Sequence, residues 1–466
     1  MDKKRSRSKE LLDSKKDRIS ELPESVLSHI LSRLPTEDAV RTSVLSRKWE
    51  YKWTSIYNLT FDDRKRFRYS HRWRKWKVQK QPKKTDFMNF VDRVLALSKN
   101  SSIKECHLLF LDVYDPFRMK TWITAALSSN VQRLLISYAA DLVLPRWFFT
   151  SDSLMNLELK LCKIKIPMNI SYSNLRILDI HGVEFQNDES LQSSHLVFTF
   201  PVLEEFLSSG CKWWNMKLLE IKAPRLARFE MTDSSFECVN DGPNDCKIEV
   251  RGGNLAKLKC GVDKFANFYF SSTSTIVDAS LHYSEPYTID DLKLRMETSF
   301  RACMILRQVS AFIRSLELST DLVQVLSHRY PSCRLPFFYK LTHLKVYSAR
   351  MAIECDAALI DFLKEVPFLE SLLFTGQYSS KAAGNNDGIE LMSGNFLCCL
   401  KVVKIEYSSY FPSPVESHLA KFLLRNAVRL KEFLIYQEHK RHEADQVKNK
   451  LLNCSRGSSH VFILCI

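Results

Sequence analysis

The clearest pattern along the chain is a short apolar template, in which one apolar anchor precedes an alternating pair of apolar positions. It is plain in "LMNLELKLC" from Leu154 and in "LRILDIHGV" from Leu175. The template begins at Ile103, Val131, Leu154, Leu175, Leu203, Leu226, Leu255, Ile276, Ile313, Leu341, Leu369, Leu400 and Leu430. Successive anchors are 21 to 37 residues apart, and a unit of this size cannot bury its apolar face alone. The pattern predicts an α/β solenoid, a curved stack of repeats with strands on the concave side and helices or irregular turns outside.

Residues 22–53, "LPESVLSHILSRLPTEDAVRTSVLSRKWEYKW", have helical rather than alternating spacing. Pro23 fits the first turn of a helix, where its missing N–H costs nothing. An apolar stripe follows at Val26, Leu27, Ile30, Leu31 and Leu34. Pro35 ends this helix, and Thr36 is expected to cap the next one. The segment therefore predicts two short amphipathic helices in succession.

A third helix is predicted from Ser46, which would cap it and place Trp49 and Trp53 one turn apart on one face. Three helices in about 35 residues form only a marginal core. Part of their apolar surface must therefore be covered by another domain or another protein. The segment predicts a docking module.

The same segment resembles the F-box. The resemblance is carried by Leu22-Pro23, the Ile30-Leu31-x-x-Leu34-Pro35 segment, the run 39–46 and Trp49. It implies docking on a Skp-type adaptor, which joins the F-box to a cullin in an SCF ubiquitin ligase. The adaptor contacts that follow are Leu22, Pro23, Ile30, Leu31, Leu34, Pro35, Val44 and Trp49, which offer apolar contact area.

The wording "DAVRTSVLSRKWEYKWTSI" is similar to the large plant branch of this family that carries leucine-rich repeats and a C-terminal FBD domain. Lys52 departs from the leucine usual there, which could loosen the third helix. The expected divisions are a disordered basic N-terminus (1–16), the F-box (17–60), a basic linker or loop (61–85), the repeats with an N-terminal cap helix (86–396) and the FBD domain (397–466). The FBD resemblance rests on "CLKVVKIEYSSYF" and the helix–strand pattern after it, and it implies a terminal repeat and cap. Residues 376–395, rich in Gly, Asn and Ser, predict an exposed loop.

The formal charge of +15 belongs to two segments. Residues 2–18 hold eight Lys/Arg and four acids, and residues 64–84 hold eleven Lys/Arg and no acid. In 64–84 the cations could follow phosphates while aromatic rings stack on bases, namely those of Phe67, Tyr69, Trp73 and Trp76. A solvated loop is the favoured interpretation, and attraction of an acidic substrate or scaffold face is a third. The N-terminal "KKRSRSK" could act as a nuclear import signal.

No arrangement suited to catalysis is found in the sequence. Glycine-rich phosphate loops and nucleophile motifs are absent, and the thirteen cysteines form no C-x-x-C pair. His439 and His442 are one helical turn apart without a third ligand, which favours a solvated helix face. The paired acids at 62–63 and 290–291 are expected to cap helices or turns. We expect no enzyme activity, no cofactor and no metal site.

No apolar run is long enough for a membrane span, and the basic N-terminus lacks the apolar region of a signal peptide. We therefore expect an intracellular protein of the nucleus, the cytoplasm or both. Together with the resemblance, these features predict the substrate-recognition subunit of an SCF-type ubiquitin ligase, with a cullin reached through the adaptor. The alternatives are an interaction scaffold without a ligase role, or nucleic-acid binding through 64–84. The target protein is unknown, and specificity is expected in concave side chains such as Lys160, Lys163, Asp179, His181, Lys345 and Tyr347.

Overall fold

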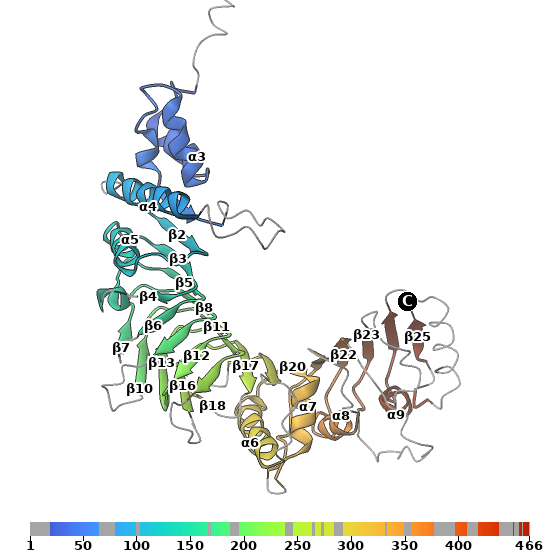
Figure 1. The fold of residues 1–466 in the computed structure, drawn as a ribbon. Coiled ribbons are helices and arrows are strands. Elements are labelled where there is room, and N and C mark those ends of the chain that lie inside the picture. The colour runs from blue at the N-terminus through green and yellow to red at the C-terminus, as the bar shows by residue number, and fades with distance from the viewer. Residues whose placement is uncertain are drawn as a thin grey trace, which may run out of the picture. The chain divides into compact units, whose positions relative to one another are not determined.

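The computed structural model describes most of the chain, in two compact units of 1–165 with 172–175 and of 166–171 with 176–466 (Figure 1). The described residues are 19–64, 80–98, 103–142, 144, 146–165, 167, 169–186, 195–237, 246–262, 266–271, 275–283, 292–330, 333–348, 356–376, 397–407, 418–437, 451, 456–458 and 460–465. Four expectations lie outside them: the N-terminus 1–16, most of the basic segment, nearly all of the loop 376–395, and the pairs His439/His442 and Asp290/Asp291.

The first unit begins with short helices and continues into a parallel sheet. Its elements are α2 (Glu24–Leu31), α3 (Thr36–Arg41), the 3-10 turns η1 (Thr42–Val44) and η2 (Lys52–Ser55), β1 (Asn58–Asp62), α4 (Lys80–Leu97), β2 (Glu105–Phe110), α5 (Pro116–Ser128), β3 (Arg133–Tyr138), β4 (Asp141–Leu142), η3 (Arg146–Thr150), β5 (Asn156–Lys160) and β6 (Lys163–Lys165). Strands β1, β2, β3 and β5 pair in this order, and β4 pairs with β6. One strand of each repeat thus lies beside the corresponding strand of the next.

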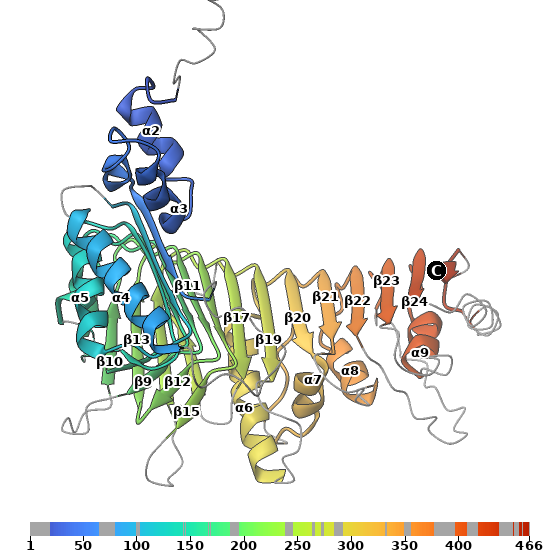
Figure 2. The ribbon, with the colours of Figure 1, turned by 45° about the horizontal axis from the view of Figure 1, so that its top comes forward.

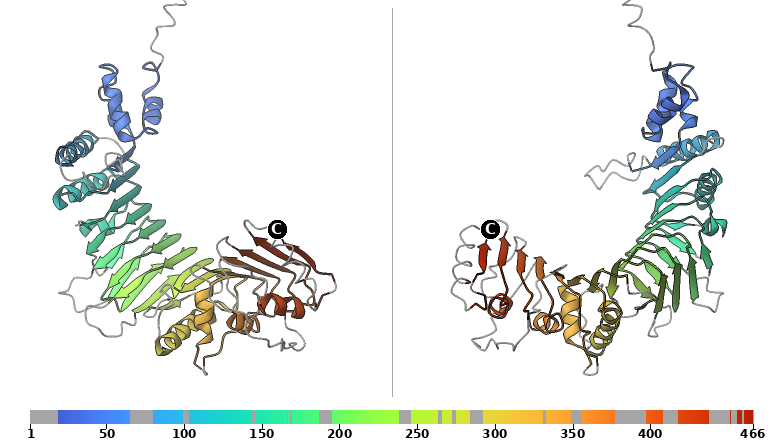
Figure 3. Two further views of the ribbon diagram at one scale, coloured as in Figure 1. Left: turned by 45° about the vertical axis from the view of Figure 1, so that its right-hand side comes forward. Right: turned by 180° about the vertical axis from the view of Figure 1, so that it is seen from behind.

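The second unit continues the same plan. Its main sheet runs in chain order through β8 (Ile177–His181), β11 (Glu205–Ser209), β14 (Arg228–Thr232), β17 (Lys257–Val262), β19 (Asp278–Tyr283), β20 (Ser315–Ser319), β21 (His343–Tyr347), β22 (Ser371–Gly376), β23 (Val402–Tyr407), β24 (Glu432–Gln437) and β25 (Phe462–Cys465). Every pairing among them is parallel (Figure 3). Four helices follow the later strands: α6 (Leu292–Val309), α7 (Thr320–Ser327), α8 (Asp356–Leu363) and α9 (His418–Asn426). Figure 2 shows α7, α8 and α9 along one side of these strands.

The predicted repeat is confirmed strand by strand. Each of the thirteen anchors is at most 1% exposed, and each stands two positions before a strand of the main sheet. Two alternating residues of each strand point into the same core, as Leu344 and Val346 do on β21, and all are apolar except Ser208 on β11. Stacked copies therefore share one interior within each unit, which is what a repeat needs in order to be stable.

A fourteenth copy was missed at the N-terminal end. Ile56 is fully buried and stands two positions before β1, where Leu59 and Phe61 are buried in alternation. The segment "IYNLTF" fits the template, but it follows directly on the helical pattern and was assigned to the F-box. The main sheet of the first unit consequently starts inside residues 17–60.

The outer side of the middle repeats consists of strands, where helices or irregular turns were expected. A second sheet pairs β7 (Asn169–Ser171), β10 (His195–Thr199), β13 (Leu218–Ala223), β16 (Cys246–Gly252) and β18 (Ala266–Phe270). A third pairs β9 (Glu184–Gln186), β12 (Lys212–Trp214) and β15 (Ser235–Glu237). The three-residue strands leave too few alternations for a sequence pattern, whereas β10, β13, β16 and β18 are as long as the main-sheet strands and were missed. Each of these strands pairs with one of a neighbouring repeat. Stacked rings fill the space between these sheets, with Trp213 lying 4.2 Å from Phe185 between ring centres.

The predicted third helix of the F-box is wrong. Residues 46–51 form turns, and only the 3-10 turn η2 follows. The indole Nε1 of Trp53 donates to the carbonyl oxygen of Glu50 at 3.1 Å, and that of Trp49 donates to Ser20 Oγ at 2.7 Å. Both tryptophans are buried. The chain therefore uses turns to direct both rings inward, where one straight helix had been expected.

Candidate docking site

Helix α2 separates its apolar stripe into an inner and an outer row. Leu27 and Leu31 are each 2% exposed, whereas Val26 and Ile30 are 41% and 43% exposed. Residues four apart lie on one face of a helix, so the outer row is a continuous apolar strip. Leu34, 38% exposed, follows the helix.

Further exposed apolar residues lie at the end of α3. Val44 and Leu45 are 84% and 66% exposed, the largest values in this part of the described chain. Pro23 and Pro35 are also exposed and stand directly before α2 and α3, as their N-cap residues. We call Val26, Ile30, Leu34, Val44 and Leu45 the apolar face.

The eight residues expected to contact an adaptor therefore divide into two groups. Pro23, Ile30, Leu34, Pro35 and Val44 are exposed, and Leu22 is half-buried. Leu31 and Trp49 are buried inside the module, so they support the surface from beneath. Val26 and Leu45 were not in the expected set. Helical spacing identifies an apolar stripe, but it does not say which of its residues face the chain's own core.

Hydroxyl groups attach the two helices to β1. Thr36 Oγ1 accepts from the backbone N–H of Thr60 at 2.7 Å, and Ser32 Oγ accepts from that of Tyr57 at 3.1 Å. The expectation that Thr36 caps α3 is therefore wrong, because Pro35 precedes the helix and no side chain caps it. A buried N–H without a partner is costly, so β1 requires these hydroxyls, and they fix the helices against the sheet.

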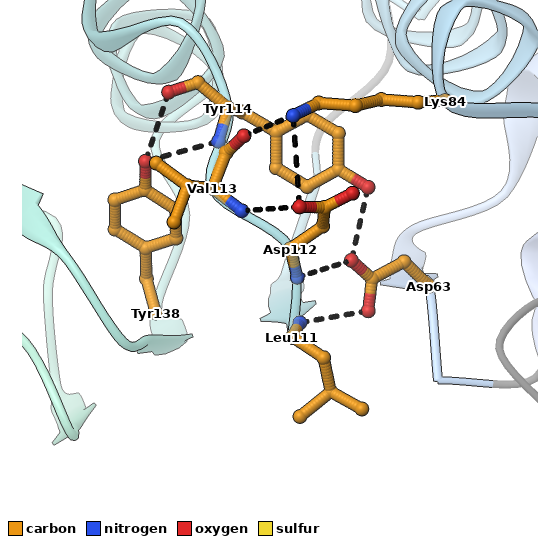
Figure 4. Close-up of polar contacts among 7 residues, drawn as sticks. All are labelled: Asp63, Lys84, Leu111, Asp112, Val113, Tyr114 and Tyr138. Atoms are coloured by element: carbon orange, nitrogen blue, oxygen red, sulfur yellow. Dashed lines mark hydrogen bonds and ion pairs between the residues drawn. The ribbon is translucent and has the colours of Figure 1, made fainter. Parts of the chain in front are cut away.

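A second polar cluster binds the end of β1 to the loop before α5 (Figure 4). The Asp63 carboxylate accepts from the backbone N–H groups of Leu111 at 2.8 Å and Asp112 at 3.1 Å, and from the Tyr114 hydroxyl at 2.9 Å. Asp63 is 1% exposed. Burial raises the pKa of this carboxyl, and the three hydrogen bonds act in the opposite direction. Asp63 therefore joins two segments of the chain, a role that differs from the predicted cap.

Lys84 reaches the same loop from α4. Its Nζ donates to the carbonyl oxygen of Val113, lies 3.6 Å from a carboxylate oxygen of Asp112 and stands 5.2 Å from the Tyr114 ring centre. Asp63 and Lys84 are at the two ends of the basic segment 64–84. Both of its described ends are thus bound at one loop.

The residues expected on the concave side are placed unequally. Lys160, Asp179, His181, Lys345 and Tyr347 lie on main-sheet strands, but Lys163 is on β6, outside the main sheet. Lys160 is ion-paired with Glu158, and Lys345 with Glu317 at 2.5 Å between Nζ and Oε1. Burial, together with nearby carboxylates, raises the pKa of Tyr347 to about 12. These charges mostly satisfy one another and do not single out a target.

Nothing in the described part of the chain suggests a metal site or a membrane helix. No group of three His, Cys, Asp or Glu side chains there could hold a metal ion. No helix within those residues is long and apolar enough to cross a membrane. The nine cysteines whose side chains the structure describes are free thiols.

Comparison with known proteins identifies the N-terminal module. The model of the F-box domain matches residues 19–61, which includes α2, α3 and nearly all of β1. The chain therefore has an F-box at its N-terminal end.

Relatives match along nearly the whole chain. An F-box/FBD/LRR-repeat protein of Arabidopsis thaliana is 29% identical over 460 residues, covering 96% of this chain and 94% of the relative. A second protein of that description is 26% identical over 461 residues, covering 96% of each. An FBD-associated F-box protein from the same plant is 27% identical, covering 93% of this chain and 92% of the relative. The resemblance to plant F-box/leucine-rich-repeat/FBD proteins is thus confirmed, and it supports the role of a ubiquitin-ligase substrate receptor.

Proposed function

We propose that the chain is the substrate-recognition subunit of an SCF-type ubiquitin ligase. The F-box docks on a Skp-type adaptor, which joins it to a cullin, and the repeats bind the target protein. The observation that carries the proposal is the apolar face, five large side chains left uncovered on a module whose interior is complete. Removing exposed aliphatic side chains of this kind from water at an interface is favourable, by about 25 cal/mol per Å² of apolar surface.

The chain contributes binding and position, and the chemistry of ubiquitin transfer belongs to a charging enzyme on the cullin. Holding a substrate lysine near a reactive thioester raises its effective concentration. The residues that support adaptor docking are Leu22, Pro23, Ile30, Leu34, Pro35 and Val44 at the surface, with Leu31 and Trp49 supporting them from inside.

Co-purification of the full chain with a Skp-type adaptor and a cullin tests the proposal. Wild type should bind, and Ile30→Asp/Leu34→Asp should lose binding while its circular dichroism and melting temperature stay unchanged. Phe117→Asp is the matched control, since Phe117 is 77% exposed at the start of α5. Binding by the double variant at wild-type yield would exclude this docking face.

Deletion of the F-box cannot make the same distinction. Strand β1 lies inside the matched residues and pairs with β2, so the deletion removes a strand of the sheet. The repeats would lose stability whether the module is a dock or the cap of an interaction scaffold. Point substitutions on the apolar face separate the two roles, because they leave β1 intact.

A further inference from the structure

Five four-residue turns lead into strands β20 to β24 of the second unit. Each has the anchor of its repeat at the third position, and we call them the entry turns. Their sequences are "AFIR" (311–314), "YKLT" (339–342), "PFLE" (367–370), "CCLK" (398–401) and "VRLK" (428–431). The anchor points into the core, so the other positions decide what the turns present outside.

Two aromatic side chains, Phe312 and Phe368, occupy matching positions in these turns, and Lys340 occupies the position between them. Phe312, Lys340 and Phe368 each stand three residues before Ser315, His343 and Ser371, which pair across the strands. Phe312 is 37% and Phe368 47% exposed. One position earlier, Tyr339 is 65% and Val428 55% exposed. The exposed rings therefore lie at the N-terminal ends of neighbouring strands.

Backbone hydrogen bonds hold neighbouring entry turns together. The carbonyl oxygen of Arg314 accepts from the N–H groups of Thr342 and His343, both at 3.0 Å. That of Thr342 accepts from Glu370 and Ser371, at 2.9 and 3.0 Å, and the pattern continues to Lys431. Adjacent strands are about 4.8 Å apart, so Phe312 and Phe368, two strands apart, are about 10 Å from one another. The entry turns therefore form a regular, hydrogen-bonded row.

Exposed apolar residues concentrate here. Among the described residues of the second unit, ten large apolar side chains are exposed, and five of them lie in or just before the entry turns: Phe312, Phe337, Tyr339, Phe368 and Val428. The rings of Phe337 and Tyr339 are 4.7 Å apart between centres, and Lys340 Nζ lies 5.0 Å from the Phe312 ring centre. The earlier turns 201–204, 224–227 and 253–256 contain no aromatic residue. The row is a feature of the last repeats alone.

The same turns carry an excess of positive charge. They contain five Lys/Arg and one acid, Glu370, whose Oε1 is 2.8 Å from Lys401 Nζ. Arg314, Lys340, Arg429 and Lys431 are exposed. Exposed rings beside exposed arginines are typical of protein interfaces, in which Tyr, Phe and Arg are enriched.

We propose that the entry turns bind an acidic protein segment that carries large apolar side chains. The apolar side chains would pack on Phe312, Tyr339 and Phe368, and the carboxylates would face the surrounding cations, since interfaces pair opposite potentials. A second copy of the chain is a poorer occupant at this surface, because its own entry turns carry the same excess of positive charge. This surface goes beyond the adaptor-docking role and does not depend on it.

Selection of random 12-residue peptides on the purified full chain, followed by fluorescence anisotropy, tests the proposal. Selected peptides should be net acidic with two or more large apolar residues. Their affinity should fall by about 10-fold or more for Tyr339→Ser/Phe368→Ser and for Lys340→Glu/Arg429→Glu. The matched control is Leu292→Ser/Phe300→Ser, which changes two exposed residues of α6, and it should bind as wild type does.

Three results would overturn the proposal. They are a failure to enrich any peptide, enrichment of basic or neutral peptides, and equal binding by both turn variants. A further result, measured by sedimentation velocity, would also overturn it. If wild type forms a dimer that Tyr339→Ser/Phe368→Ser abolishes, the surface binds a second copy of the chain. Co-purification with the Skp-type adaptor is measured on the same variants and should be unaffected, so failure of either proposal is seen separately.

Discussion

The carboxylate of Asp63 accepts a 2.9 Å hydrogen bond from the hydroxyl of Tyr114, across 51 positions of sequence. Both residues are buried. The bond joins the first residue after β1 to the loop before α5. The contact fixes β1, the strand at the end of the F-box, within the sheet of the first unit.

Replacement of Asp63 by alanine should strongly destabilise the first unit. The change leaves two partly buried backbone N–H groups and the buried Tyr114 hydroxyl without their acceptor, and a fully buried group of this kind costs about 1–3 kcal/mol. We expect the free energy of unfolding to fall by roughly 3 kcal/mol, measured by urea unfolding. Asp38→Ala removes an exposed ion pair with Arg41 and should change it by less than about 1 kcal/mol. Equal effects of the two substitutions would contradict the role given to Asp63.

Thr36→Val should weaken the attachment of α3 to β1 at nearly constant volume. Valine lacks the hydroxyl that accepts from Thr60 N–H, so that partly buried donor loses its partner. The expected loss is about 1–3 kcal/mol in the free energy of unfolding, and hydrogen exchange of the Thr60 amide should speed up. Thr54→Val is the control, because its hydroxyl donates to the Tyr51 carbonyl at an exposed site. If Thr60 stays protected in Thr36→Val, another group must accept this N–H.

Trp49 should matter for stability and Leu34 for partner binding. Trp49 is 8% exposed, and truncating a buried tryptophan to alanine usually costs about 3–5 kcal/mol. Leu34→Ala removes a side chain that is 38% exposed and should leave the melting temperature nearly unchanged. Differential scanning calorimetry distinguishes them, with Tyr51→Ala as an exposed aromatic control. A melting temperature equally lowered by Leu34→Ala and Trp49→Ala would place Leu34 in the core instead.

Tyr347 should give the protein an alkaline pH dependence. Its pKa is raised to about 12, whereas an unfolded tyrosine titrates near 10. The protonated form is thus favoured in the folded state, and its stability contribution is complete below pH 10 and lost as the pH rises through 12. Tyrosinate absorbance at 295 nm should show one group fewer titrating near pH 12 in Tyr347→Phe than in wild type. An identical high-pH titration in the two proteins would refute the assignment.

The sequence pattern predicted the main sheet because each of its strands is marked by residues that are neighbours in the sequence. An anchor, two intervening residues and an alternating pair define a strand with one buried face, and at all thirteen positions the fold agrees. The copy that begins at Ile56 was missed because the helical pattern of the F-box runs directly into it, with no linker to mark where the repeat starts. Outer strands as short as Lys163–Lys165 could not be predicted. They are stabilised by a strand one repeat away, which a local pattern does not contain.

The candidate site was predictable in part. Helical spacing and the resemblance to the F-box identified the module and most of its exposed residues, including Ile30 and Leu34. They did not separate Leu31 and Trp49, whose burial depends on how turns 46–51 direct the chain. Thr36 shows the same limit, since a residue suited to a helix cap is used by a strand 24 positions later.

Strand β1 lies inside the F-box and is also the first strand of the sheet of the first unit. No flexible joint therefore separates the α2 helix from that sheet, and the two move as one body. A partner bound at Ile30 and Leu34 would keep a fixed angle to β2 and β3, so little rotational freedom remains at this junction. The orientation of the F-box relative to this sheet is set by the backbone hydrogen bonds between β1 and β2. It is not set by the length of a linker between the two.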